Sequence, residues 1–397
     1  MQTGVSAHLD RPRVVLEQYV IPRYRVPFFA ALAEKVDLLV VASKDRTVDG
    51  VTDVRDRLPF QSVRLMAEPG TNYHPDIGRS LREHQAQVWV SYDHAVERFR
   101  GGKFIAKYVL QQGVRRLHWG CDGYLVRDFV AYRRHFNSPW REPRAHLIWR
   151  RERKHLQALD GFIVYSSHTA RFYEAVFDIP RDRITVAHNA IDTQVIQEVR
   201  RQREAIGGLR DPLRIAFVGR MTEGKGVDTL LHAFSEVSRR LPGSSLVFVG
   251  DGSGREAWEK LALQLGLGDV HFLGAVFDDR ELAGILCKCS LFVLPGLGGL
   301  ALNAAMAAGL PVVCTHGDGT ELDLVHEGVN GWHFPPGDTH ALAAALIRAL
   351  EDAERLRSMG RTSAALAENE FSLSAMVDAY ASRIALAITE SYGAGGA

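Results

Sequence analysis

Residues 215–234, IAFVGRMTEGKGVDTLLHAF, restrict the fold of this chain more than any other segment. A short apolar run leads into a Gly-Arg turn, a lysine between two glycines, and an amphipathic helical pattern. This order predicts a strand, a turn and a helix, the repeating unit of parallel sheets. Arg220 and Lys225 would then lie beside the amino end of the helix, where free N–H groups and the helix dipole attract anions. Because arginine binds phosphate oxygens bidentately and lysine adds a compact charge, the pair indicates a diphosphate site.

The same turn has other interpretations. The string GRMTEGKG nearly fits the phosphate-loop pattern, but Gly226 stands where a Ser or Thr hydroxyl would bind magnesium, which disfavours an NTPase. A structural turn with solvated cations is also open. A later turn at 249–254, VGDGSG, resembles half of a dinucleotide fingerprint, so an NAD-linked oxidoreductase remains a weaker alternative.

Short apolar runs alternate with amphipathic helical patterns along most of the chain, which predicts parallel sheets covered on both faces. The expected fold class is therefore α/β, with two doubly wound, Rossmann-like domains whose carboxyl-end loops face a central cleft. The expected strands are Val14–Gln18, Leu38–Ala42, Ser62–Met66, Val88–Ser91, Arg115–Trp119, Phe162–Tyr165, Ile184–Ala187, Ile215–Val218, Leu246–Val249, His271–Leu273, Leu291–Leu294 and Val312–Cys314.

The domain boundaries follow from a polar, helix-forming stretch that ends in Gly-Gly-Leu-Arg-Asp-Pro. We expect an N-terminal domain at 1–195, a linker at 196–212 and a C-terminal domain at 213–371. A last helix within 372–397 could pack on either domain, with the N-terminal one preferred, and a flexible tail follows it.

Composition limits the partners. The net charge of +1 gives no overall attraction to nucleic acid, so we expect none as a partner. The N-terminus lacks a signal-peptide core, and no apolar run approaches the ~18 residues of a membrane span. A cytoplasmic location is therefore expected.

With these motifs the chain resembles the family-4 glycosyltransferases, which are retaining, metal-independent GT-B enzymes that use nucleotide-sugar donors. The resemblance rests on FVGRMTEGKGVDTLLHAF, LGAVFDDRELAGIL, LFVLPGLGGLALNAAMAAGLPVV and GTELDLVHEGVNGWHFPPGD, and more weakly on RVVLEQYVIPRYRVPFFAALAE and ITVAHNAID. It implies an acceptor-binding N-terminal domain and a donor-binding C-terminal one. It implies no metal and no cofactor beyond the donor itself, of UDP or GDP type, with a hydroxyl acceptor.

The resemblance also assigns donor contacts. Gly219, Arg220 and Lys225 match positions that bind the diphosphate. Val276 and Phe277 match the segment that contacts the nucleobase. Gly298, Gly299 and Leu300 match the loop beneath the sugar and phosphates. A glycine pair permits close backbone approach, and the helix that follows offers its positive end.

One departure affects the sugar contacts. The family commonly has two glutamates eight positions apart, and Gly296 and Ala304 occupy those places here. A variant subfamily could hold the donor differently, a neighbour such as Asn303, Asp318 or Glu321 could replace the lost contacts, or the chain could be non-catalytic. Glu321 has two equal interpretations, as a donor contact and as a helix-start carboxylate.

The N-terminal domain should supply the acceptor site. His118, near an expected strand end, and Asp122 are the candidates to orient the sugar or the acceptor hydroxyl, with His94 a weaker one. A lone histidine is more often structural. Arg23 and Arg25 follow the first strand and could meet an anionic acceptor, or could simply be solvated.

Residues 127–155 contain nine Lys or Arg against three Asp or Glu, interleaved with Phe129, Tyr132, Phe136, Trp140 and Trp149. This mixture predicts either a peripheral contact with an anionic membrane, with the aromatic rings at headgroup depth, or a grip on a polyprenyl diphosphate. A solvated helical face with core aromatics is the alternative.

The leading hypothesis is a retaining glycosyltransferase that moves a hexose-like sugar from a nucleoside diphosphate to a glycan, lipid-linked or small-molecule hydroxyl. The alternative is a non-catalytic nucleotide-sugar or glycan-binding partner of an active transferase.

Overall fold

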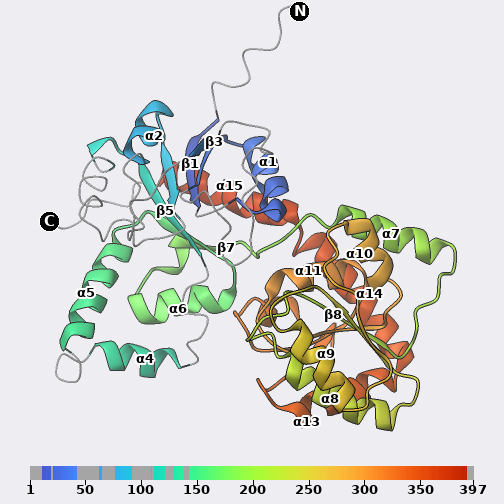
Figure 1. Cartoon of the computed structure of the whole chain (residues 1–397). Helices are drawn as coiled ribbons and strands as arrows, with labels where there is room; N and C mark the ends of the chain where they lie inside the picture. Colours follow the sequence, from blue (N-terminus) through green and yellow to red (C-terminus); the bar gives the residue numbers. More distant parts are fainter. Residues whose placement is uncertain are drawn as a thin grey trace, which may run out of the picture. The chain divides into compact units, whose positions relative to one another are not determined.

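The computed structural model describes residues 11–18, 21–42, 62–64, 77–91, 109, 111–120, 128–137 and 143–390. The chain divides into two compact units, each built on one parallel sheet (Figure 1). Unit 1 comprises Met1–His188 with Ser374–Ala397, and unit 2 comprises Asn189–Leu373. The expected fold class, α/β with two doubly wound domains, is confirmed.

Unit 1 contains a seven-stranded parallel sheet in the order β3-β2-β1-β4-β5-β6-β7. Its strands are β1 (Arg13–Gln18), β2 (Asp37–Ala42), β3 (Ser62–Arg64), β4 (Val88–Ser91), β5 (Arg115–Gly120), β6 (Gly161–Val164) and β7 (Ile184–Val186). Strands such as β2, DLLVVA, are buried along nearly their whole length. Runs of this kind lack polar alternation because both faces of the sheet are covered.

The helices of unit 1 are α1 (Val26–Ala33), α2 (Ile77–Glu83), α4 (Phe129–Phe136), α5 (Pro143–Gln157), α6 (Ser167–Phe177) and α15 (Leu373–Thr389), with short 3-10 turns η1 (Arg23–Arg25) and η4 (Arg181–Arg183). Local sequence sets the ends of α6: the Ser166 hydroxyl accepts from the Thr169 N–H at 3.1 Å, and Asp178 closes the helix in the left-handed region.

Helix α15 belongs to unit 1 although it comes last in the chain. Tyr380 packs against the rings of Phe28 and Trp119, with centroids at 4.8 and 5.6 Å. Arg383 has no exposed surface, and its guanidinium donates to the Asp182 carbonyl at 2.9 Å and to Glu390 Oε2 at 2.8 Å. Aromatic packing and a buried cation therefore attach the helix to this sheet.

Unit 2 contains a six-stranded parallel sheet in the order β10-β9-β8-β11-β12-β13. Its strands are β8 (Arg214–Val218), β9 (Ser245–Val249), β10 (Val270–Phe272), β11 (Leu291–Leu294), β12 (Val312–Thr315) and β13 (Gly331–Phe334). The chain runs outward from β8 in one direction through β9 and β10, then in the other through β11 to β13. The switch point therefore lies between β8 and β11, where ligands of such sheets bind at the carboxyl ends of the strands.

The helices of unit 2 are α7 (Gln194–Ala205), α8 (Val227–Arg240), α9 (Arg255–Gln264), α10 (Asp279–Leu286), α11 (Gly299–Ala307), α12 (Glu321–Leu324), α13 (Thr339–Leu350) and α14 (Ala353–Asn369). Helices α8, α9 and α13 pack together, as do α7, α10, α11 and α14 (Figure 1). Two separate apolar clusters accompany these groups, one on each face of the sheet.

The stretch 196–212, expected to be a helix-forming linker, begins within helix α7 (Gln194–Ala205), which belongs to unit 2. Helix α7 packs against α10 and α11, and its side chains Ile196 and Val199 are buried in the unit 2 core. Two buried apolar residues are enough to dock an otherwise polar helix, so the helical part of this stretch packs on the unit 2 core.

One stretch of the described chain, Ala353–Thr389, is long and apolar enough by composition to cross a membrane. In the structure it consists of two helices, α14 and α15, which belong to different units. Met359 and Ile384 are buried in them, so core packing accounts for the apolar character of both helices.

Candidate functional site

The turn after β8, which carries Arg220, is fixed by the neighbouring turn after β9. The Gly219 N–H donates to the Val249 carbonyl at 3.0 Å, and the Met221 N–H donates to the Asp251 carbonyl at 2.8 Å. At Gly250, φ is 140°, and an added Cβ would lie 1.9 Å from the Gly219 carbonyl oxygen. Only glycine fits there, so the backbone that carries the exposed Arg220 side chain is tightly set.

Lys225 lies at the switch point between β8 and β11. Its Nζ donates to the Leu297 carbonyl, and the Leu297 N–H donates to the Gly224 carbonyl at 3.1 Å. The next residue, Gly226, has φ of 65°, and a Cβ there would meet the Pro295 carbonyl oxygen at 2.5 Å. These contacts connect the loop after β8 with the loop after β11, and the lysine ammonium lies where the two loops meet.

The electrostatics of Lys225 indicate an anion site. Burial lowers the pKa of Lys225, the nearby Arg220 guanidinium lowers it further, and Asp318 acts in the opposite direction. An anion bound beside Lys225 and Arg220 would offset both the desolvation of the lysine and the repulsion between the two cations.

Helix ends add to this positive potential. Helix α8 begins after Gly226, and α11 begins after Gly298, on the two sides of the switch point. Within the described chain, no side chain caps either amino end. Their N–H groups and dipoles therefore remain available to an anion beside Arg220 and Lys225.

Glu321 shapes the loop after β12. Its carboxylate is buried and accepts from the Gly317 N–H at 2.7 Å and from the Gly319 N–H at 3.0 Å. Burial raises its pKa to about 6, and Asp318 adds to the shift, while the N–H donors oppose it. These contacts support the interpretation as a helix-start carboxylate, and they position Asp318 close to Gly299, whose added Cβ would lie 3.4 Å from Asp318 Oδ2.

The two positions that lack glutamate differ structurally. At Gly296 an added Cβ would lie 2.3 Å from the Gly224 carbonyl oxygen and 2.6 Å from the Lys225 carbonyl carbon, so no side chain fits. Ala304 is 3% exposed and packs in the apolar core of unit 2. Its neighbour Asn303 is 1% exposed, and both its amide atoms lack a hydrogen-bond partner in the described structure. Asn303 shares a helix face with Gly299, which faces Asp318 and Thr320.

The other predicted donor positions lie at the same carboxyl edge of the unit 2 sheet. Phe277 follows β10 and is 77% exposed, with Val276 partly buried beside it. Leu300 is partly buried in the first turn of α11. The sequence did not identify the Leu297 carbonyl as the partner of Lys225, because a backbone acceptor leaves no trace in residue identity.

His118 lies near the end of β5 in unit 1, as expected, and its side chain is buried. It is 2% exposed, and its ring packs edge-on against Phe162 and Tyr173, each with a centroid distance of 5.9 Å. This packing favours a structural role for the histidine, and its contact with a substrate stays a prediction. Asp122 and His94 lie outside the described residues.

The two arginines after β1 differ from each other. Arg23 is exposed, whereas Arg25 is 3% exposed, so the interpretation of Arg25 as a solvated side chain is wrong. The Arg25 guanidinium donates to Tyr165 Oη at 2.7 Å and lies 5.4 Å from the ring centroids of Trp119 and Tyr165. Cation–π contacts in a buried aromatic cage account for this arginine without an acceptor.

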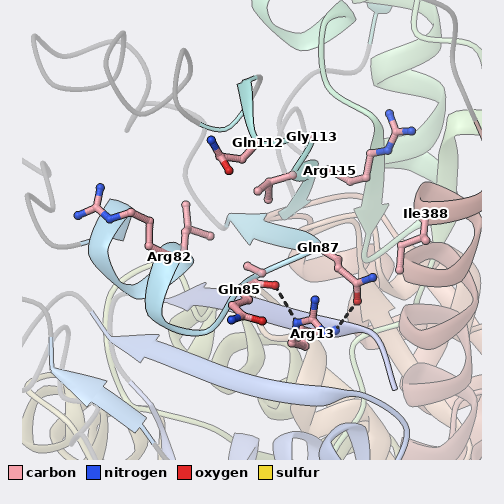
Figure 2. Close-up of a pocket in the computed structure, with 11 residues that line it drawn as sticks. Arg13, Arg82, Gln85, Gln87, Gln112, Gly113, Arg115 and Ile388 are labelled. Atoms are coloured by element: carbon pink, nitrogen blue, oxygen red, sulfur yellow. Dashed lines mark hydrogen bonds between the residues drawn. The ribbon is translucent and has the colours of Figure 1, made fainter. Parts of the chain in front are cut away.

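Unit 1 has a hollow of about 420 Å³ at the opposite edge of its sheet, where β1, β4 and β5 begin (Figure 2). Arg13, Arg82 and Arg115 line it, but Arg13 Nε donates to the Gln85 carbonyl at 2.9 Å and Arg115 pairs with Asp160 at 3.2 Å. The Arg82 and Arg115 side chains point away from each other (Figure 2). None of the predicted functional residues lines this hollow.

Comparison with known proteins gives matches over both halves of the chain. Residues 199–365 match the family Glycosyl transferases group 1, and residues 28–195 match Glycosyltransferase Family 4. Over 188 residues the chain is 31% identical to an uncharacterized glycosyltransferase of Methanocaldococcus jannaschii, a match that covers 45% of this chain and 47% of that protein. The chain thus spans less than half the length of the curated relatives it matches first.

Solved structures resemble the chain over nearly its whole length. Sucrose-phosphate synthase from Thermosynechococcus elongatus has a TM-score of 0.69 at 20% identity and covers 94% of this chain and 98% of its own. An Anabaena protein in complex with UDP and glucose has a TM-score of 0.65 at 16% identity, over 94% of this chain and 99% of its own. Such identities establish the fold alone. The chain has the GT-B fold, and each of its halves matches one glycosyltransferase family model.

Proposed function

We propose that this protein is a retaining glycosyltransferase that moves a sugar from a nucleoside diphosphate donor to a hydroxyl acceptor. The observation that carries the proposal is the position of Lys225. Its ammonium lies at the switch point of the unit 2 sheet, beside Arg220 and between the amino ends of α8 and α11. Cations and helix N-termini directed at one place suit a diphosphate better than a neutral ligand.

The donor would be of UDP or GDP type. In this proposal its diphosphate lies against Arg220 and Lys225, and Gly298 and Gly299 allow it to approach the backbone at the start of α11. The nucleobase would contact the backbone of Val276 and the exposed ring of Phe277. The Anabaena protein of similar fold was solved with UDP and glucose, which supports this class of donor.

The chemical step breaks the bond between the anomeric carbon and the diphosphate oxygen, and the electron pair stays on that oxygen. A bond forms between the anomeric carbon and the acceptor oxygen on the same face of the sugar, and the acceptor proton passes to the departing phosphate. Arg220 and Lys225 stabilise the charge that grows on the leaving group. Removing one such preorganised donor typically costs about 3–4 kcal/mol. We propose that these side chains, without a metal ion or a further cofactor, carry the charge stabilisation.

The sugar contacts would come from the loop after β12 and from α11. Asp318 is held beside Gly299 by the Glu321 loop, and Asn303 carries the amide that lacks a partner in the described structure. We propose that unit 1 supplies the acceptor site and that the reaction takes place in the cytoplasm. We assign no direct contact to His118 or Arg25, because both side chains are buried in unit 1.

The packing at Gly296 favours a second candidate function, a non-catalytic nucleotide-sugar-binding partner. A glutamate cannot be accommodated there in this conformation, so the usual contact with the sugar is absent at that position. Under this alternative, the protein would bind a donor tightly but never cleave it.

A thermal-shift screen followed by a donor-cleavage assay tests both candidates. A donor at about 100 times its dissociation constant should stabilise the protein by roughly 2.7 kcal/mol. Slow release of UDP or GDP from the stabilising nucleotide sugar, in the absence of an acceptor, supports the enzyme. Tight binding without any release supports the binding partner, and no stabilisation by any nucleotide or nucleotide sugar contradicts both.

A further inference from the structure

Helix α5 has two sides of different character. Its inner side packs into unit 1: Trp149 and Leu156 are buried, and Arg153 pairs with Asp178 at the end of α6. The only carboxylate of α5, Glu152, acts on the partly buried Tyr132 of α4: desolvation raises the pKa of Tyr132, and the charge of Glu152 raises it further. The only negative charge of α5 therefore lies on the inner side of the helix.

The outer side of α5 carries exposed aliphatic side chains among cations. Leu147 is 50% exposed and Ile148 is 57% exposed, and Arg144, Arg150, Arg151 and Lys154 are exposed around them. Spacings of three, four and seven residues place Arg144, Leu147, Ile148 and Arg151 on one helix face. We call the six residues Arg144, Leu147, Ile148, Arg150, Arg151 and Lys154 the α5 ridge.

The cations of the α5 ridge form no ion pair within the described structure, unlike Arg133 and Arg153, which both pair with Asp178. A single exposed leucine on a protein surface needs no explanation. Two adjacent exposed aliphatic side chains surrounded by cations are more typical of an interaction surface. The ridge lies on an outer helix of unit 1, next to α4 and α6 (Figure 1).

We propose that the α5 ridge docks the protein on an anionic phospholipid surface. Leu147 and Ile148 enter the boundary between headgroups and acyl chains, while the surrounding arginines and lysine meet lipid phosphates. A helix that lies in the plane of a membrane needs this combination of a short apolar stripe and flanking cations. The same surface chemistry would serve an acceptor presented by a membrane, but the docking itself does not depend on the proposed function.

The structure corrects the expectation for the aromatic side chains of this region. Phe129, Tyr132 and Phe136 pack against the core cluster around α6, and Trp149 is 4% exposed. The sequence predicts aromatic rings at headgroup depth, but the exposed apolar side chains of α5 are the aliphatic Leu147 and Ile148. Trp140 lies outside the described residues.

Co-sedimentation of the full chain with vesicles tests the proposal. We expect binding to vesicles of phosphatidylcholine mixed with phosphatidylglycerol, weaker binding at high salt, and little binding to phosphatidylcholine alone. Because each basic residue near the surface adds about fivefold to partitioning, the double variant R150Q/R151Q should bind about twentyfold to thirtyfold more weakly. Its matched control is R357Q/R361Q, which removes two exposed cations from α14 in unit 2.

The aliphatic contribution needs its own pair of variants. L147Q/I148Q keeps every charge of the ridge and should lose at least tenfold in binding, because two aliphatic side chains that would enter the membrane are replaced by polar ones. L209Q/L263Q is the control, since these leucines of unit 2 are 88% and 78% exposed. Circular dichroism checks that each variant is folded. Equal binding by ridge variants and controls, or no binding to the anionic vesicles at low salt, would overturn the proposal. The assay contains no nucleotide sugar, so its failure is separate from a failure of the proposed function.

Discussion

The Lys225 ammonium donates to the carbonyl of Leu297, across the point where the unit 2 sheet reverses its strand order. This contact joins the loop after β8 to the loop after β11 and leaves a cation at the place where a doubly wound sheet binds its ligand. The partner is a backbone oxygen, so the lysine is positioned before any anion arrives. We infer that an anionic ligand accepts a hydrogen bond from the same ammonium, either in place of the Leu297 carbonyl or together with it. Binding therefore requires little rearrangement of the lysine.

The close approach at Gly296 predicts intolerance to any side chain. In Gly296→Ala the new Cβ would meet the backbone of Gly224 and Lys225 at 2.3–2.8 Å, so the loop must shift. We expect a loss of about 1–3 kcal/mol in stability and weaker binding of UDP. Gly284→Ala in α10 is the control, because nothing lies within 4 Å of an added Cβ there, and it should be neutral or stabilising. Thermal unfolding and a UDP titration measure both. Unchanged melting and unchanged UDP affinity in Gly296→Ala would show that the loop is not packed as described.

The buried carboxyl of Glu321 predicts a dependence of stability on pH. Its pKa rises from 4.5 in the unfolded chain to about 6 in the folded protein, so the folded state holds the proton more tightly. This contribution is fully present below pH 4.5 and is lost as the pH rises through about 6. Its size is on the order of 2 kcal/mol. The difference in unfolding free energy between wild type and Glu321→Gln should therefore change across this range, as chemical denaturation at several pH values can measure. A difference that does not vary with pH would contradict the burial of an ionisable carboxyl at this position.

The buried guanidinium of Arg383 predicts local stability at the end of the chain. Arg383→Met removes the hydrogen bonds that the guanidinium donates to the Asp182 carbonyl and to the Glu390 carboxylate, at a cost of about 2 kcal/mol. Hydrogen exchange of the α15 amides should then accelerate about thirtyfold, while exchange in α8 of unit 2 stays the same. Arg357→Met, on the exposed face of α14, should change neither. Unaltered protection of α15 in Arg383→Met would mean that aromatic packing alone holds this helix.

The sequence predicted those elements whose pattern is complete within the element itself. Strand β8, its turn and helix α8 follow from IAFVGRMTEGKGVDTLLHAF, since apolar run, glycines and amphipathic spacing agree. Strand β13, GWHF, was missed because it is short, begins with glycine and lies at the edge of the sheet. The packing of α7 was harder to predict than its helicity, because Ile196 and Val199 are its only buried residues and the rest of the helix is mostly polar.

The candidate site was predictable only in part, for a similar reason. Lys225 could be recognised because glycines and a helix start surround it in sequence. The burial of His118 and Arg25 depends on Tyr173, Tyr165 and other residues far along the chain, and no local pattern reports such contacts. The same holds for Gly296, whose lack of space is created by the backbone of residues 224 and 225.

The central claim is that Lys225 binds and stabilises a diphosphate, and calorimetric titration of UDP and GDP into wild type and Lys225→Ala tests it most directly. Loss of a charge-assisted contact should weaken binding of the preferred nucleotide by about tenfold to a hundredfold. Turnover of the donor should fall on the order of a hundredfold or more. Lys260→Ala, which removes an exposed lysine paired with Glu256 on α9, should behave as wild type. If the folded Lys225→Ala protein binds the nucleotide and cleaves the donor as wild type does, the account of this site is contradicted.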